Sequence, residues 1–422
     1  MYKYDHKKIK GKIFSRGHIY DSVEEQAANE LAIELMKKDI NIVIAFAGTK
    51  KENGVDTGKP CVVFGVRKKI EKSNLPNELI IPKTLSEDIL TDVIEHPVIK
   101  AIGTCTGGTS TACPPHGDKY RPLMGGISSI NAGSTAGTLA CIVKDSTDNT
   151  LVGLTCNHCL GQQYDTGYPT PDEGTSNAIG YNVLQPSPRD GGQYPLDMYG
   201  TVKRITPIKF GNSTENYSDS GIVTVEIDDA IPGILEIGTG PFLFTDKSYY
   251  NVGAETYKSG RTTGITPPPI ATVTNKNVSL SVCYADDCYS SNNLALFSNQ
   301  IQISAPSRWS KGGDSGSAVL VEVDGEKKII GILFAGSSDG IDTFVSPSEY
   351  LVSILQVEAW NGDIVVDHNT ASFISSNRIC YELVEDTGDP KTSTVDEVFN
   401  SCEECANNIL SSSSSSEMPS SD

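Results

Sequence analysis

The sequence predicts a mainly β protein, in which a β-rich domain at residues 121–360 follows a small α+β unit at residues 1–103. From residue 121 onward, short apolar runs alternate with clusters of Gly, Pro, Asn and Asp, a pattern typical of a barrel or sandwich. The chain contains 39 Gly residues, and its aromatic content is 7%. This composition suits a turn-rich β protein better than a helical bundle. A length of 422 residues also exceeds one ordinary domain.

The N-terminal unit combines one helical pattern with apolar runs. Residues 21–38 repeat apolar side chains at helical spacing, with Asp21 or Ser22 as the candidate N-cap. The runs INIVIAFAG, KPCVVFGVRKKI and TDVIEHPVIKAIG follow and are expected to be strands. Residues 104–120 are rich in Gly, Thr, Pro and Cys without periodicity, so they are expected to form a linker. Near residue 350, VSPSEYLVSILQVEA predicts a terminal helix.

Residues 361–422 form an acidic tail rich in Cys and Ser, which is expected to be partly disordered. The whole chain has a net charge of −19. Because such a surface repels phosphates, nucleic acid is not expected as a partner. No apolar stretch is long enough for a membrane helix, so no membrane partner is expected either.

The strongest chemical signal is the segment Lys311-Gly312-Gly313-Asp314-Ser315-Gly316-Ser317, which precedes the apolar run AVLVEV. A nucleophilic serine needs a tight turn and backbone N–H groups directed at the developing oxyanion. Flanking glycines permit that backbone. By itself the motif is equally compatible with an ordinary surface turn, since Gly, Asp and Ser are common turn residues.

One histidine of the chain is the candidate general base for Ser315. Of the six histidines in the chain, only His158, in LVGLTCNHCLG, lies inside the β-rich domain. It follows an apolar strand, where an imidazole can reach a cleft. The carboxylate that orients the imidazole should precede a buried strand between the two residues. Asp219, in YSDSGIVTVEI, is preferred to Asp197, in YPLDMYGTV, because a more continuous apolar run follows it.

These motifs, taken in order, resemble the chymotrypsin-like serine peptidases. A finer similarity is Lys258-Ser259-Gly260-Arg261-Thr262-Thr263-Gly264, which looks like the SGRTTG segment of the α-lytic protease and streptogrisin type. LTCNHCL corresponds to the segment that carries the family's histidine, and GILFAGS resembles the strand that lines the substrate channel. The resemblance covers roughly residues 121–358. The motif here is GDSGS where the family commonly has GDSGG.

The resemblance implies two antiparallel β-barrels with the active site between them. It also implies an oxyanion hole formed by the N–H groups of Gly313 and Ser315, and a substrate site that includes Trp309, Ala335 and Gly336. A disulfide between Cys141 and Cys159 fits the family's pattern, with Cys156 as a competitor for either partner. Cys283 and Cys288 could close a hairpin loop.

The chain contains 11 Cys, an odd number, so at least one thiol has no partner within the chain. No secretory signal is recognisable, which favours a cytoplasmic or virion-associated protein with reduced thiols. In the tail, Cys402 and Cys405 form a CxxC motif, and Cys380 adds a third thiol. Because no fourth ligand is nearby, a thiol pair is expected rather than structural zinc. No metal and no cofactor are predicted.

The sequence therefore predicts a serine endopeptidase with His158, Asp219 and Ser315 as its triad and a protein or peptide as its substrate. Two alternatives stay open. One is a non-enzymatic structural or binding protein, such as a virion component, on the protease fold. The other is a protease restricted to self-cleavage, with residues 1–103 as a pro-segment or recognition domain. Neither the cleavage specificity nor the oligomeric state can be inferred from the sequence.

Overall fold

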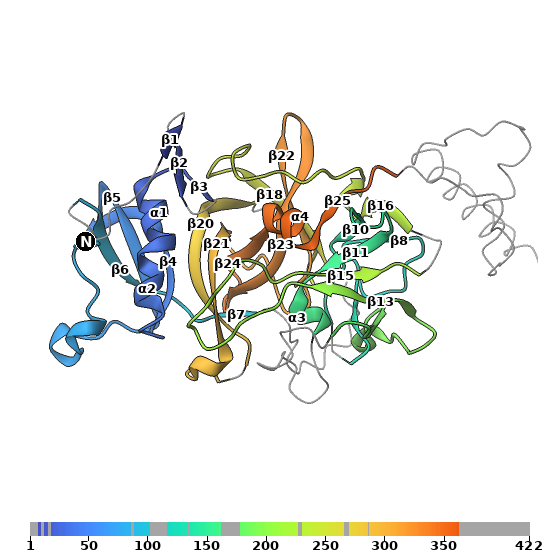
Figure 1. Cartoon of the computed structure of the whole chain (residues 1–422), viewed down its shortest axis with the longest axis horizontal. Coiled ribbons are helices and arrows are strands. Elements are labelled where there is room, and N and C mark those ends of the chain that lie inside the picture. The colour runs from blue at the N-terminus through green and yellow to red at the C-terminus, as the bar shows by residue number, and fades with distance from the viewer. Residues whose placement is uncertain are drawn as a thin grey trace, which may run out of the picture.

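The structure is a computed structural model. It describes residues 7–9, 12–15, 18–85, 88–101, 116–133, 136–161, 178–226, 230–265, 270–285 and 287–362. The predictions for the CxxC motif, for Cys380 and for the Ser-rich run lie outside these residues, as does most of the expected linker. Within the described residues the protein is mainly β, as predicted (Figure 1).

One sheet follows the expected start of the β-rich domain. Its seven strands come from residues 130–359, and the chain returns at its last strand to complete the sheet. All neighbouring strands in it are antiparallel. In spatial order they are β25 (Val357–Ala359), β10 (Cys141–Asp145), β11 (Leu151–Thr155), β15 (Gly221–Thr224), β13 (Met198–Ile205), β12 (Asn182–Leu184) and β9 (Ile130–Asn131).

A second sheet is larger and contains six strands that pair in a cycle, because β20 pairs with both β18 and β21. These six are β18 (Glu255–Gly260), β20 (Ala271–Cys283), β21 (Leu294–Ser304), β24 (Asp342–Pro347), β23 (Glu326–Ser337) and β22 (Ala318–Val323). At the margins of this sheet lie β14 (Glu215–Asn216) and β19 (Gly264–Ile265). The two-barrel architecture that the resemblance implies stays a prediction.

The hydrophobic core explains where the two sheets meet. One cluster of buried side chains lies within the first sheet and includes Val183 and Tyr199, and another lies within the second and includes Val273 and Val321. The largest cluster draws side chains from both sheets, with Leu154 as one example from the first. The sheets are therefore held together by a shared apolar layer.

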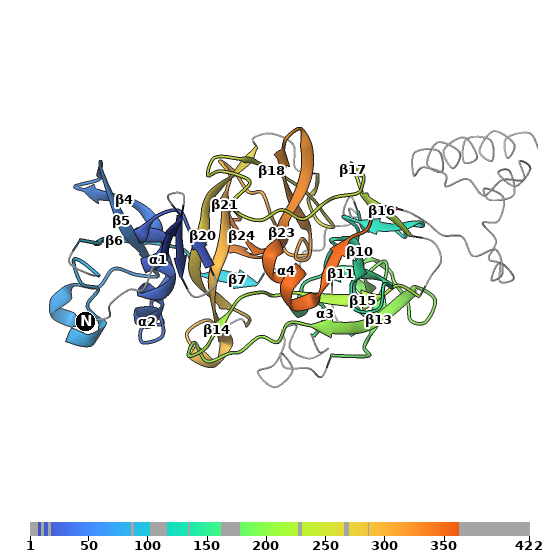
Figure 2. The same cartoon turned by 45° about the horizontal axis from the view of Figure 1, so that its top comes forward.

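The N-terminal unit extends the second sheet. Strand β4 (Ile42–Glu52) pairs with β20, at Ser279↔Ala45 and Leu280↔Ile44. Beyond it follow β5 (Val55–Val66) and β6 (Leu90–Glu95). Figures 1 and 2 show this blue region beside the yellow strands β20 and β21. The unit expected at residues 1–103 thus shares a continuous hydrogen-bonded sheet with the segment expected to be catalytic.

The helix predicted at residues 21–38 is divided in two. Helix α1 (Val23–Glu30) begins after Ser22, whose side chain accepts a hydrogen bond from the Glu25 N–H, so Ser22 is the N-cap. It ends at Glu30, and after Leu31, which caps it, α2 (Ala32–Met36) follows. At this point the Glu34 N–H bonds to the Leu31 carbonyl three residues back, which tightens the turn. Both helices pack on β4.

The third apolar run expected in this unit forms two strands instead of one. Strand β6 ends at Glu95, and β7 (Ile99–Ala101) begins after Pro97. Proline lacks the N–H group that a continuing ladder needs, which explains the division. While β6 continues the outer sheet beside β5, β7 runs between β20 and β23.

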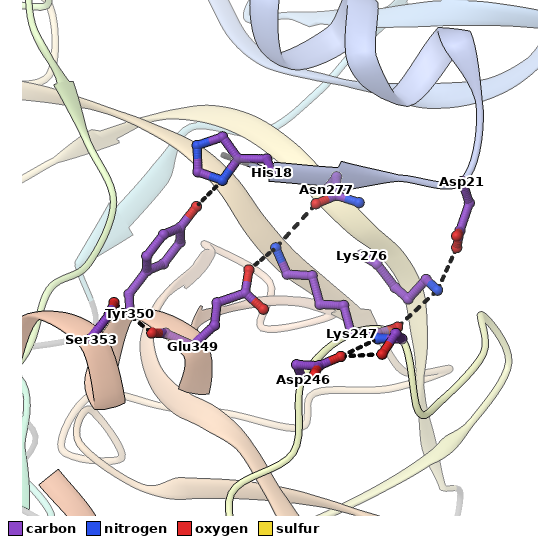
Figure 3. A pocket seen from close by; sticks show the side chains of 10 residues that line it. His18, Asp21, Asp246, Lys247, Lys276, Asn277, Glu349, Tyr350 and Ser353 are labelled. Carbon is purple, nitrogen blue, oxygen red and sulfur yellow. Dashed lines mark hydrogen bonds and ion pairs between the residues drawn. The ribbon is translucent and has the colours of Figure 1, made fainter. Parts of the chain in front are cut away.

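Side chains also join the N-terminal unit to the body of the protein, around a pocket of about 300 Å³. Figure 3 shows Lys276 directed at Asp21, at 2.5 Å, and Lys247 directed at Glu349, at 3.2 Å. His18 reaches Tyr350 on α4 (Ser348–Leu355), the helix expected near residue 350. Because both lysines are buried, each needs the carboxylate that it contacts.

The remaining elements are short. Two small sheets consist of β1 (Lys7–Ile9), β2 (Lys12–Ser15) and β3 (His18–Tyr20), and of β8 (Leu123–Gly125), β16 (Ala230–Ile234) and β17 (Gly238–Thr239). Helix α3 (Asn157–Leu160) follows β11, and single 3-10 turns occur at Lys72–Asn74, Asn77–Leu79, Pro188–Asp190 and Ser291–Asn293. None of the described helices has the length and hydropathy needed to span a bilayer.

Candidate active site

The loop that carries Ser315 joins β21 to β22 and requires two of its glycines. Gly313 and Gly316 have φ values of +96° and +95°, a region that side chains disfavour. A Cβ atom at Gly316 would also meet the carbonyl of Thr138 and the hydroxyl of Thr155. The glycines thus permit a tight turn pressed against the first sheet.

Asp314 fixes this loop from inside. Its Oδ1 accepts the N–H groups of Thr262 at 2.9 Å and Thr263 at 3.1 Å, and its Oδ2 accepts the Lys311 N–H at 2.9 Å. The Nζ of Lys258 lies 3.7 Å from Oδ2, and both side chains are fully buried. Burial lowers the pKa of Lys258. Through Thr262 and Thr263, the SGRTTG segment therefore fixes the position of the loop.

His158 and Asp219 form a buried pair. His158 lies on α3, directly after β11, and Asp219 lies just before β15. Nδ1 of His158 is 2.6 Å from Oδ2 of Asp219, and the His158 backbone N–H donates to Oδ1 at 3.0 Å. Both side chains are 0% exposed. Because β11 and β15 are paired neighbours, the two residues meet although they are 61 positions apart.

This pairing governs the charge of the imidazole. Burial by itself would lower the pKa of His158. The negative charge of the Asp219 carboxylate is the main influence in the opposite direction, and the pKa of His158 is raised overall. The carboxylate therefore stabilises the imidazolium form, which is the form that arises when a general base takes a proton. Asp197, the alternative carboxylate, instead accepts from Lys119 at 2.8 Å and from the Gln193 N–H at 2.8 Å.

Two further side chains hold Asp219, and sequence reasoning missed both. The Tyr284 hydroxyl donates to Oδ2 of Asp219 at 2.8 Å, and the Asp219 N–H donates to the Ser346 hydroxyl at 3.0 Å. Burial raises the pKa of Tyr284, so its phenol stays a proton donor. Tyr284 directly follows β20 and Ser346 lies on β24, so no local pattern linked them to Asp219.

The segment that carries His158 lies against the loop that carries Ser315. The Cys159 thiol donates to the Ser315 carbonyl at 3.6 Å, and the Thr138 N–H donates to the same carbonyl at 2.8 Å. Nε2 of His158 and Oγ of Ser315 are buried, and neither has a hydrogen-bond partner in the described part of the chain. They are therefore not bonded to each other in this state.

The two backbone N–H groups expected to form the oxyanion hole also make no hydrogen bond to the described residues. Among the described residues, neither the Gly313 N–H nor the Ser315 N–H donates a hydrogen bond. The Gly313 carbonyl accepts from the Thr138 hydroxyl at 2.7 Å, which fixes the orientation of that peptide. Two donors thus remain available beside Ser315.

The residues expected at the substrate site fall in two places. Trp309 is 3% exposed and belongs to a core cluster, with Nζ of Lys258 5.1 Å from its ring centre. Ala335 and Gly336 lie on β23 and pair with β7 of the same chain, at Ala335↔Ala101 and Gly336↔Lys100.

The cysteines differ from the implied pattern. Cys141 and Cys159 are free buried thiols, so the disulfide expected between them is absent, and Cys156 is free as well. The Cys159 thiol instead points at the Ser315 carbonyl. Hydrogen bonding to Cys156 lowers the pKa of Cys159 against the effect of burial, and the charge of His158 lowers it further. Cys283 and Cys288 are joined, as the loop spacing suggested.

His116 falls in the expected linker but is part of the folded body. It is 1% exposed, its Nδ1 lies 2.7 Å from the Gly126 carbonyl, and its Nε2 lies 2.9 Å from Glu236. The folded body of the protein therefore includes this residue.

Comparisons with known proteins give structural neighbours only. No family model and no curated protein matches the chain. Similar solved structures include a glutamic-acid-specific serine protease, with 20% identity, a TM-score of 0.37, and 56% of this chain and 100% of that chain covered. Protease A of Thermobifida fusca has 20% identity and a TM-score of 0.36, covering 56% and 97%. Cellulomonas bogoriensis chymotrypsin has 17% identity and a TM-score of 0.36, covering 56% and 98%. Likeness at this level does not assign a function to the chain.

Proposed function

We propose that the chain is a serine endopeptidase on a chymotrypsin-like, two-barrel fold, with Ser315 as nucleophile, His158 as general base and Asp219 as the orienting carboxylate. The observation that carries this proposal is the buried His158–Asp219 pair. Asp219 occupies Nδ1 of His158, so Nε2 is the ring nitrogen that can accept a proton. The segment that carries His158 also packs against the Ser315 loop.

The chemistry would proceed through an acyl-enzyme. Oγ of Ser315 attacks the peptide carbonyl while its proton passes to Nε2 of His158, and Asp219 stabilises the resulting imidazolium. The N–H groups of Gly313 and Ser315 donate to the oxyanion. His158 then protonates the leaving amine, and water releases the acyl group. A short approach of Nε2 to Oγ is needed, and such contacts often tighten only when substrate binds.

The direct test is labelling with a fluorophosphonate probe, followed by peptide mapping. We expect one adduct, on Ser315, because only an activated serine beside an oxyanion hole reacts readily with such probes. Denatured protein serves as the control and should not react. A folded protein that gives no adduct at Ser315 would favour the non-enzymatic alternative.

A second candidate function, self-cleavage, has an observation of its own. Strand β7 of the N-terminal unit lies antiparallel to Ala335 and Gly336, the strand expected to hold a peptide substrate. A substrate bound in this way would have the same backbone pairing. Residues 102–115 follow β7 directly in the sequence, so we propose that the peptidase cleaves its own chain within them.

Self-cleavage predicts two fragments of the wild-type protein, separated within residues 102–115. We expect denaturing mass spectrometry to show both fragments for wild type and one intact chain for Ser315→Ala. Native mass spectrometry should still show one particle, because β4 remains paired with β20 and Asp21 with Lys276. A wild-type protein that stays one intact chain, as Ser315→Ala does, together with Ser315 labelling in wild type, would reject self-cleavage and leave the peptidase proposal standing.

A further inference from the structure

Three side chains next to the proposed catalytic pair form a cluster with the composition of a metal site. Cys156, His158 and Cys159 each offer one ligand atom, and these atoms lie within 4.8 Å of one another. All three side chains are 0% exposed. Among the described residues this is the one group of its kind, and it consists of two sulfurs and one imidazole.

The size of the cluster suits a tetrahedral ion. Zinc binds thiolate sulfur at about 2.3 Å and imidazole nitrogen at about 2.0 Å, so its ligands lie roughly 3.5 to 3.8 Å apart. Because the ligand atoms of the cluster all lie within 4.8 Å of one another, their separations exceed the zinc values by at most about 1 Å, a gap that side-chain rotation can close. Sulfur and imidazole together favour Zn²⁺ and related soft cations over Mg²⁺ or Ca²⁺. Three protein ligands leave the fourth position open.

The imidazole is already held as a metal ligand would be. Asp219 occupies Nδ1 at 2.6 Å, and Nε2 is buried without a partner among the described residues. A carboxylate on one ring nitrogen and a metal on the other is the usual outer-shell arrangement of zinc-binding histidines. The orphaned Nε2 is an observation independent of the two thiols.

Loss of the thiol protons would leave no backbone group unsatisfied. The Cys156 thiol donates to the Leu333 carbonyl at 3.1 Å, and Cys159 donates to the Ser315 carbonyl at 3.6 Å. Each carbonyl has a second donor at 2.8 Å, the Gly316 N–H for Leu333 and the Thr138 N–H for Ser315. A buried carbonyl without any donor would be costly, and that cost does not arise here.

Neither apolar packing nor a disulfide accounts for the whole cluster. Buried free cysteines often behave as small apolar side chains, and Cys141 and Cys61 fit that description. In the described part of the chain, these two do not have a second thiol and an imidazole within ligand distance, as Cys156 and Cys159 do. A disulfide between Cys156 and Cys159 would use both thiols but would leave Nε2 of His158 unpartnered. A metal ion bound to Nε2 and to both sulfurs would satisfy all three groups at once.

We propose that Cys156, His158 and Cys159 bind a soft divalent cation such as Zn²⁺. Two sulfur–metal bonds and one nitrogen–metal bond form, and the two thiol protons pass to solvent. The bound ion takes the Nε2 lone pair that would accept the Ser315 proton. Zn²⁺ is therefore a reversible inhibitor of the peptidase, a consequence that rests on the proposed function, whereas metal binding itself does not.

The test uses Co²⁺ as a spectroscopic probe on the full-length chain, reduced and freed of metal. The five cysteines outside the described residues, at positions 105, 113, 380, 402 and 405, are replaced by Ser so that they do not contribute. We expect one Co²⁺ per chain, with intense sulfur-to-cobalt charge-transfer absorption that Zn²⁺ displaces. Cys156→Ser and Cys159→Ser should each weaken binding about 10-fold or more, and Cys141→Ser should not.

X-ray absorption of the zinc-loaded five-Ser protein gives a second readout that needs no change in the cluster. We expect two sulfur ligands and one imidazole. Binding without sulfur ligands, or binding that is unchanged in Cys159→Ser, would overturn the proposal. Where the protein hydrolyses a peptide, saturating Zn²⁺ should lower the rate about 10-fold or more, and a chelator should restore it. A protein that binds Co²⁺ through sulfur but never reacts with fluorophosphonate would keep the metal site and reject the peptidase.

Discussion

Replacing Ser315 by Ala is expected to lower kcat/KM for a casein-derived peptide by roughly 10⁴-fold or more, because the nucleophile of the acyl-transfer step is lost. Stability should change little, since the Ser315 hydroxyl makes no hydrogen bond among the described residues. The measurement is initial hydrolysis rate on protein whose thermal unfolding matches wild type.

Ser353→Ala is the matched control. Ser353 is exposed on α4, where its hydroxyl donates to the Glu349 carbonyl within the same helix. It should retain the wild-type rate. Hydrolysis by Ser315→Ala at the wild-type rate would reject Ser315 as the nucleophile.

Asp219→Asn is expected to reduce kcat by about 10⁴-fold, with the fold retained. The carboxylate accepts from both the Nδ1 and the backbone N–H of His158, and also from Tyr284. An amide presents its NH₂ group to one of these donors, which favours the tautomer of His158 with Nε2 protonated. That tautomer cannot take the Ser315 proton.

Two further variants show whether the loss of activity is specific to Asp219. Tyr284→Phe removes one of the donors to Asp219 and should cost about 1 kcal/mol, or several-fold in rate. Asp197→Asn changes the alternative carboxylate, which bonds to Lys119 and Gln193, and should leave kcat unchanged. A large loss in Asp197→Asn with normal activity in Asp219→Asn would reverse the assignment.

The sequence was informative where a candidate site residue lies in a short segment with its own local pattern. The glycines around Ser315 are required by two positive φ values, and a strand end before α3 places His158 as expected. The preference for Asp219 over Asp197 depends on the apolar run that follows it, and that run is the buried strand β15. In each case the local pattern and the tertiary contact have the same physical cause, a loop anchored to a buried strand.

Contacts between distant segments left no such pattern. The pairing of β4 with β20 joins residues more than 200 positions apart, and the sequence of neither strand indicates which strand it pairs with. The same holds for Tyr284 on Asp219, and for β7 on Ala335 and Gly336. The implied disulfide between Cys141 and Cys159 was wrong because the family pattern fixes a spacing, whereas the direction of each thiol depends on its neighbours.

The position of β4 on β20 has a consequence for any shortened form of the protein. Residues 279–283 of β20 have β21 on one side and β4 and β7 on the other. A truncation product starting after β7 would expose unpaired backbone there, beside the apolar side chains of Leu280 and Val282. Such a bare margin is a template for aggregation. Recombinant production of that fragment should therefore require residues 1–101 supplied in trans, as a separate polypeptide that caps the sheet.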